Sequence, residues 1–158
     1  MALVLALIGS LTQITSTVIE PPKPDFLALV PLKSKEPPAA LQKQADWNAR
    51  VAEAVALAKY LDKAWPKLLD GTASAELTGN CLLVVEQFDV ALHALDTEPT
   101  LTDALTRIRA YRALIGAVLR NIERAEAQGL PPPATKKQVA QVLQRIDRHY
   151  RSLFSRVA

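Results

Sequence analysis

Few residues of this chain could serve catalysis or metal binding, and its two histidines are the first to consider. Asp89 stands four residues before His93, so one face of a helix would carry both side chains, whereas His149 lies on a different expected helix. Neither histidine belongs to the Glu-x-x-His pair that di-iron sites in helical bundles require. Because Asp89 and His93 have no neighbouring Cys, Glu or third His, we interpret them as a solvated pair and predict no metal site.

The single cysteine and the paired acids also argue against catalysis. Cys81 falls within the apolar stripe of an expected helix at 74–95, where a thiol behaves as a small hydrophobic group and burial disfavours its thiolate. We expect Glu86 and Asp89, on the same helix, to be exposed and not sunk in a pocket as an acid–base pair. The chain has no P-loop, dinucleotide glycine pattern, Cys-x-x-Cys or haem-attachment sequence. We therefore predict that the protein is not an enzyme and uses no cofactor or small-molecule substrate.

The composition favours an all-α fold that would position these residues on helices. Hydrophobic residues make up 49% of the chain and aromatic residues only 5%, so the core must consist mainly of Leu, Val, Ile and Ala. Side chains of this kind favour packing of helix against helix. Apolar positions recur at three- and four-residue steps in four segments, at about 38–65, 74–95, 100–128 and 135–157.

The connections between these four segments are short, which predicts their topology. Long helices joined by a few residues lie antiparallel to their predecessors. We therefore predict an up-down-up-down four-helix bundle over residues 38–158, preceded by a hydrophobic helix at 1–19 and an extended, proline-rich connector at 20–37. Helical repeats of the tetratricopeptide or HEAT kind are the alternative, but the two helix pairs share no fixed-period similarity.

Local signals mark the ends of the predicted helices. Pro66 lacks a backbone donor, and we expect it to end the first helix. Thr100 followed by Asp103 resembles a capping box, and so does Thr135 followed by Gln138. These pairs predict where the third and fourth helices begin.

The helix at 74–95 is expected to carry a second apolar face, which consists of Leu83, Val90 and Ala94. Its main stripe already includes Cys81 and Phe88 on a different side. A helix that is apolar on two faces is usually central, or is covered by something outside the bundle. We therefore expect Leu83, Val90 and Ala94 to be covered, either inside the bundle or by something outside it.

The first nineteen residues contain no charged side chain. Apolar residues recur there in steps of three and four, which predicts a helix with one apolar face: Val4, Leu7, Leu11, Ile14 and Val18. Three interpretations remain open. The helix packs on its own bundle or on a neighbouring subunit, or it anchors the chain in a membrane together with sister helices, or it is a secretory signal, although it lacks a preceding basic residue and a clean cleavage site.

The connector that follows is dense in proline, which favours an extended, semi-rigid backbone. Residues 26–32 within it are too apolar to be left in water. They either lie back across the first two helices and meet Leu83 and Val90, or dock on another chain. The residues that we assign to such docking are Phe26, Leu27, Leu29 and Val30.

The net charge of +3 conceals a gradient along the chain. Residues 72–98 hold five acids and no Lys or Arg, whereas residues 131–158 hold six bases and one acid. The two regions either complement each other within the bundle or leave a basic surface for nucleic acid or anionic lipid. The basic residues that would form such a surface on the last helix are Lys137, Arg145, Arg148 and Arg156.

These patterns together favour a non-enzymatic assembly subunit of a larger particle, such as a virion, whose N-terminal arm engages like or unlike protein subunits. One alternative is a helical protein of the cell envelope that is anchored in a membrane by residues 1–19. Another is a bundle that binds nucleic acid through its last helix. The sequence does not specify a cellular location.

Overall fold

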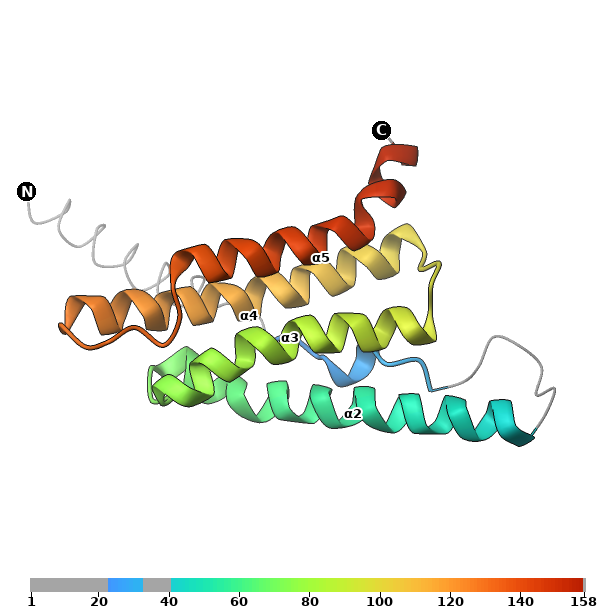
Figure 1. Ribbon diagram of the computed structural model, residues 1–158, viewed down its shortest axis with the longest axis horizontal. Helices are drawn as coiled ribbons and strands as arrows, with labels where there is room; N and C mark the ends of the chain where they lie inside the picture. The colour runs from blue at the N-terminus through green and yellow to red at the C-terminus, as the bar shows by residue number, and fades with distance from the viewer. Residues whose placement is uncertain (1–22, 33–40, 158) are drawn as a thin grey trace, which may run out of the picture.

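The computed structural model describes residues 23–32 and 41–157, and all regular structure in these two stretches is helical (Figure 1). A short 3-10 helix precedes four long α-helices. Their bounds are η1 Leu27–Leu29, α2 Leu41–Asp70, α3 Ala75–Leu95, α4 Leu101–Ala127 and α5 Lys136–Val157. The all-α class and the four long helices predicted from the sequence are confirmed. The predictions for residues 1–19, and for 20–22 and 33–37 of the connector, lie outside the described residues.

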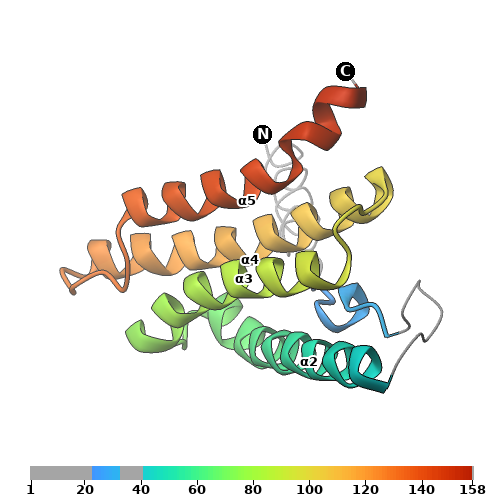
Figure 2. The same cartoon turned by 45° about the vertical axis from the view of Figure 1, so that its right-hand side comes forward.

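The four long helices lie side by side, and each reverses the direction of the one before it (Figure 1). α3 and α4 each contact the other three long helices, whereas α2 and α5 lie at opposite edges of the arrangement (Figure 2). η1 contacts α2 and α4. The groove between α3 and α5 therefore lies on the other side of the molecule from η1.

The predicted caps form as expected. The Thr100 hydroxyl accepts a hydrogen bond from the Asp103 N–H at 3.1 Å, and α4 begins at Leu101, directly after Thr100. Thr135 and Gln138 make a reciprocal capping box, in which the Thr135 hydroxyl accepts from the Gln138 N–H at 3.1 Å and the Gln138 side chain accepts from the Thr135 N–H at 2.8 Å.

The prediction that Pro66 ends the first helix is wrong, because α2 continues through Pro66 to Asp70. Tertiary contacts hold this last turn. Leu68 is buried in the core, and its carbonyl accepts a hydrogen bond from the Asn121 side chain on α4 at 2.8 Å. The helix ends instead at Asp70, and the next residue, Gly71, has a φ of 80°, a left-handed conformation that glycine adopts without strain.

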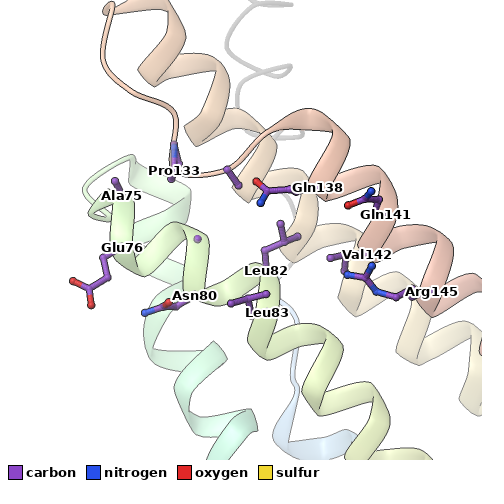
Figure 3. Close-up of a pocket in the computed structure, with 12 residues that line it drawn as sticks. Ala75, Glu76, Asn80, Leu82, Leu83, Pro133, Gln138, Gln141, Val142 and Arg145 are labelled. Carbon is purple, nitrogen blue, oxygen red and sulfur yellow. The ribbon is translucent and has the colours of Figure 1, made fainter.

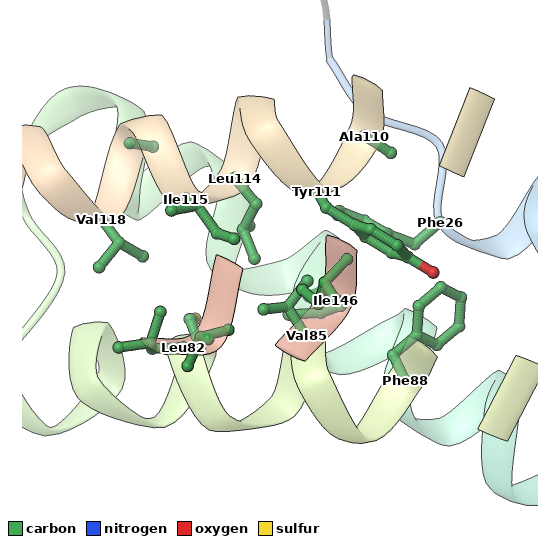
Figure 4. Packing of buried hydrophobic residues seen from close by; sticks show 14 of the residues in the cluster. Phe26, Leu82, Val85, Phe88, Ala110, Tyr111, Leu114, Ile115, Val118 and Ile146 are labelled. Atoms are coloured by element: carbon green, nitrogen blue, oxygen red, sulfur yellow. The ribbon is translucent and has the colours of Figure 1, made fainter. Parts of the chain in front are cut away.

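The core is mainly aliphatic, with Trp65 near one end and a cluster of aromatic rings around Phe88 near the other, which we call the aromatic end. Phe88 of α3 meets the rings of Phe26 and Tyr111 edge-on, with ring centroids 5.6 and 6.5 Å apart (Figure 4). Aliphatic side chains from the four long helices fill the rest, among them Leu61, Leu114 and Ile146. Edge-to-face aromatic pairs contribute about 0.5–1.5 kcal/mol beyond the area that they bury.

The segment around η1 packs into the core of its own chain. Phe26 and Val30 are buried between α2 and α4, and Leu29 packs against the core from the edge. Lys23 adds an ion pair with Asp62 of α2 at 3.0 Å.

Three expectations for this segment are corrected. Phe26 and Val30 pack on the chain's own helices and not on a partner, as one of the two alternatives held. The contact with Leu83 and Val90 that this alternative included is wrong, because those residues lie on the far side of α3. The backbone is also not uniformly extended, since η1 interrupts it. The Phe88 ring offers Phe26 an aromatic contact that the exposed face of α3 lacks.

Within residues 23–32 and 41–157, no helix has the combined length and hydropathy that crossing a bilayer requires.

Candidate functional site

A single carboxylate joins three helices at the aromatic end of the core. Asp89 of α3 is fully buried, which corrects the prediction that it is exposed. Its Oδ1 atom accepts a hydrogen bond from the Tyr111 hydroxyl of α4 at 2.7 Å and another from the Tyr150 hydroxyl of α5 at 2.6 Å. Two phenol donors therefore stabilise the one buried oxygen.

Both histidines of the chain meet at this carboxylate. His149 of α5 approaches through Nδ1, which lies 2.5 Å from Asp89 Oδ2, and His93 Nε2 lies 3.7 Å from Asp89 Oδ1. The two imidazole rings are 4.8 Å apart between centroids. The interpretation of Asp89 and His93 as a solvated pair is therefore wrong, because α5 supplies a third group that is distant in sequence.

His93 Nε2 is the unusual atom of this cluster. It is buried, it has no hydrogen-bond partner, and its distance from Asp89 Oδ1 is too long for a hydrogen bond. A buried polar nitrogen without a partner costs free energy, so it calls for an explanation.

The environment of the cluster shifts the pKa of several groups. Burial, reinforced by the Asp89 charge, raises the pKa of the Tyr111 and Tyr150 phenols well above the usual value, so both remain hydrogen-bond donors. Burial lowers the pKa of His93; the neighbouring Asp89 opposes this shift, and His149 and Arg107 add to it. This lowered pKa favours the neutral form of the His93 imidazole.

An arginine lies beside the cluster on α4. Arg107 is almost fully buried, and its Nη2 atom donates to Asp96 Oδ2 at 3.3 Å, while Nη1 has no hydrogen-bond partner. The Arg107–Asp96 pair ties α4 to the loop after α3. Arg107, Tyr111 and Tyr150 were not predicted from the sequence as site residues. The available signal was the phenol of each tyrosine, which sits in an apolar stripe and needs a partner when buried.

The arrangement can do two things chemically. It locks α3, α4 and α5 together through one charged acceptor, and it brings one carboxylate and two imidazole nitrogens close to one another. The ligand atoms of Asp89, His93 and His149 all lie within 4.8 Å of one another. Nitrogen and oxygen ligands in such a group suit a transition metal.

Cys81 lies in the core as predicted. It is fully buried, and burial raises the pKa of its thiol to about 11. This supports its role as a small hydrophobic residue and not as a nucleophile.

We expect this thiol to make folding less stable in alkali. Above pH 9 the unfolded chain loses the Cys81 proton while the folded chain keeps it, so stability falls as pH rises towards 11, by on the order of 1 kcal/mol per pH unit. Urea unfolding at pH 8 and pH 10.5 measures the fall. It should be smaller in Cys81→Ala, and an equal fall in both proteins would contradict the burial of the thiol.

The predicted basic face of α5 is partly used within the chain. Arg145 donates two hydrogen bonds to the Glu86 carboxylate of α3, at 2.6 and 2.9 Å. Lys137 and Arg148 are exposed, and the side chain of Arg156 lies outside the described residues. The Arg145–Glu86 pair is one instance of the complementarity between the acidic and basic regions.

The second apolar face of α3 is open to solvent in the described part of the chain. Leu83 is 57% exposed and Val90 55% exposed, and Ala94 is exposed on the same side. Leu83 also lines a cavity of about 380 Å³ between α3 and α5, together with Leu82, Ala134 and Val142 (Figure 3).

Comparison with known protein families, with curated proteins and with solved structures found no match to this chain.

Proposed function

We propose that this protein is a non-enzymatic structural subunit of a larger assembly. In this proposal an up-down-up-down four-helix bundle is the rigid body, and the exposed apolar face of α3 receives residues 1–19 of another copy. The observation that carries the proposal is the exposure of Leu83 and Val90, two large apolar side chains on the surface of an otherwise well-packed helix.

The spacing of these residues supports a docking surface for a helix. Leu83 and Val90 are seven residues apart, which places them on one side of α3 two turns from each other. Ala94 continues this line by a further turn, and its small side chain allows close approach. The exposed Gln87 lies between Leu83 and Val90 on the same side of α3, so the face combines apolar side chains with a polar one, as interaction sites do.

The surroundings of this face also suit a docked helix. The cavity beside Leu83 is a depression between α3 and α5 that is lined by apolar side chains such as Leu82 and by polar ones such as Asn80 (Figure 3). Arg145 of α5 borders the face on one side, and Arg50 of α2 on the other, where its guanidinium lies 3.4 Å from the Ala94 carbonyl. Interfaces commonly combine an apolar centre with a polar rim.

Residues 1–19 have the complementary pattern. They carry no charge, and their apolar residues recur at the three- and four-residue steps by which an amphipathic helix enters a groove. Burial of a fully exposed Leu or Val side chain contributes about 1.5–3 kcal/mol. An uncharged helix on Leu83 and Val90 would therefore remove apolar area of both partners from water.

A neighbouring copy is the favoured donor of this segment. The described chain begins at Lys23 beside α2, and Phe26 is anchored between α2 and α4. The apolar face of α3 lies on the other side of the helices, so residues 1–19 of the same chain would have to pass around an edge of the bundle. A second copy meets no such constraint.

The test is the mass of the full chain in solution, measured by light scattering over a range of concentrations. We expect a concentration-dependent oligomer, and we expect Leu83→Glu or Val90→Glu to raise its dissociation constant about tenfold or more, because each places a charge in an apolar interface. Leu105→Glu on α4 is the matched control, since Leu105 is also an exposed apolar side chain but lies on another helix.

Two results would contradict the proposal. One is a monodisperse monomer at all concentrations. The other is flotation of the full chain with liposomes that the Leu83→Glu change leaves intact, which would favour a membrane anchor formed by residues 1–19.

A further inference from the structure

We propose that Asp89, His93 and His149 form a binding site for a divalent transition metal, for which Zn²⁺ is the best-matched ion. The site would join α3 to α5 at the aromatic end of the bundle. It is independent of the assembly role, because none of its residues belongs to the apolar face of α3.

The distances suit a metal centre. Zinc binds His nitrogen and carboxylate oxygen at about 2.0–2.2 Å, so tetrahedral geometry places ligand atoms roughly 3.3 Å apart. The separation between His93 Nε2 and Asp89 Oδ1 is 3.7 Å, and that between His149 Nδ1 and Asp89 Oδ2 is 2.5 Å. The three ligand atoms lie within 4.8 Å of one another, so binding of an ion requires the imidazole rings to move, and the His149 side chain is 33% exposed.

The unpartnered nitrogen of His93 points to the same conclusion. His93 Nε2 is buried against Asp89 without a hydrogen bond. A cation bound between the two groups would satisfy both the imidazole lone pair and the carboxylate charge. No other neighbour within the described residues supplies such a partner.

The two tyrosines would support the ligands from behind. Their hydroxyls both donate to Asp89 Oδ1, which fixes the orientation of the carboxylate and leaves Oδ2 facing His149. Hydrogen bonds of this kind to a ligating carboxylate orient it and tune the affinity of a metal site. The three candidate ligands are therefore accompanied by two tyrosines that hold the carboxylate in place, as the outer residues of a metal site do.

The types of ligand atom and the exposure of the site to solvent indicate which class of ion would bind. Two imidazoles and one carboxylate suit Zn²⁺, whereas Mg²⁺ and Ca²⁺ prefer oxygen ligands alone. The partial exposure of His149 opens the site to solvent, so water can enter the fourth position. Arg107 adds a positive charge nearby, but Asp96 pairs with it at 3.3 Å.

The experiment titrates ZnCl₂ into the untagged, chelator-treated full chain by calorimetry, with the thermal unfolding midpoint as a second readout. We expect one ion per chain and a raised midpoint, and no effect of MgCl₂. His149→Ala and His93→Gln should each weaken Zn²⁺ binding at least tenfold and abolish the rise in the midpoint. Asp147→Asn, an exposed carboxylate on α5, should bind as the unaltered chain does.

His149 is a surface residue, so His149→Ala should fold, and circular dichroism checks that it does. Absence of Zn²⁺ binding by the unaltered chain would overturn the proposal. Binding that survives in both histidine variants would also overturn it, because the ion would then lie elsewhere.

Discussion

Replacement of Asp89 with Ala is expected to lower the free energy of unfolding by about 3–5 kcal/mol, the cost typical of removing one partner from a buried charged cluster. The change leaves the Tyr111 and Tyr150 hydroxyls buried without an acceptor, and it leaves His149 without its carboxylate. Each unsatisfied buried group costs about 1–3 kcal/mol. Chemical denaturation followed by circular dichroism measures the loss.

Two further variants define the origin of this loss. Asp89→Asn keeps an oxygen that can accept from a tyrosine but removes the charge, so its loss should be smaller than that of Asp89→Ala. Asp147→Ala removes an exposed carboxylate of α5 and should change stability by less than about 0.5 kcal/mol. If Asp89→Ala were as mild as Asp147→Ala, the carboxylate would not be the buried junction of three helices.

Replacement of Phe26 with Ala is expected to cost about 3–5 kcal/mol, although Phe26 precedes the first long helix. Its ring is fully buried and meets Phe88 edge-on, so truncation opens a cavity between α2 and α4. Urea denaturation of the full chain measures the change from the shift of the midpoint.

Leu27→Ala is the matched control for Phe26→Ala, because Leu27 is the next residue and is 45% exposed. It should cost less than about 1 kcal/mol, since its side chain remains largely in water in the folded state. If Phe26→Ala proved as mild as Leu27→Ala, the segment would not belong to the core. Phe26 would then be available to a partner, as the sequence alone also allowed.

The four helices could be predicted from the sequence because the signals for them are local. The Thr100 and Thr135 caps act over three residues, and the apolar stripes repeat within each helix. Pro66 shows the limit of local rules. The cost of a missing backbone donor is outweighed at the end of α2 by the burial of Leu68 and its hydrogen bond to Asn121, which lies on a different helix.

The Asp89 cluster could not be predicted because its members come from three helices. Asp89 and His93 taken alone resemble a polar pair on a helix surface. Only the packing of α5 against α3 brings His149 and Tyr150 to the same carboxylate. The apolar pattern of one helix predicts which of its residues share a face. It does not predict which residues of another helix will contact that face.

The position of the segment around η1 was open for a similar reason. Its apolar residues indicate that it must be covered, yet their pattern does not distinguish the groove between α2 and α4 from the outer face of α3. Phe88 decides between them, because its ring makes an edge-to-face contact with Phe26 in the first groove. As a result, Leu83 and Val90 remain uncovered in the described part of the chain.

The most direct measurement of the assembly proposal is a photo-cross-linking amino acid placed at Val90 of the full chain, in a mixture of isotopically light and heavy copies. We expect cross-links from Val90 to peptides of residues 1–19 with mixed isotope labels, and none when the cross-linker replaces Leu105. Cross-links confined to single copies, or none to residues 1–19, would contradict it.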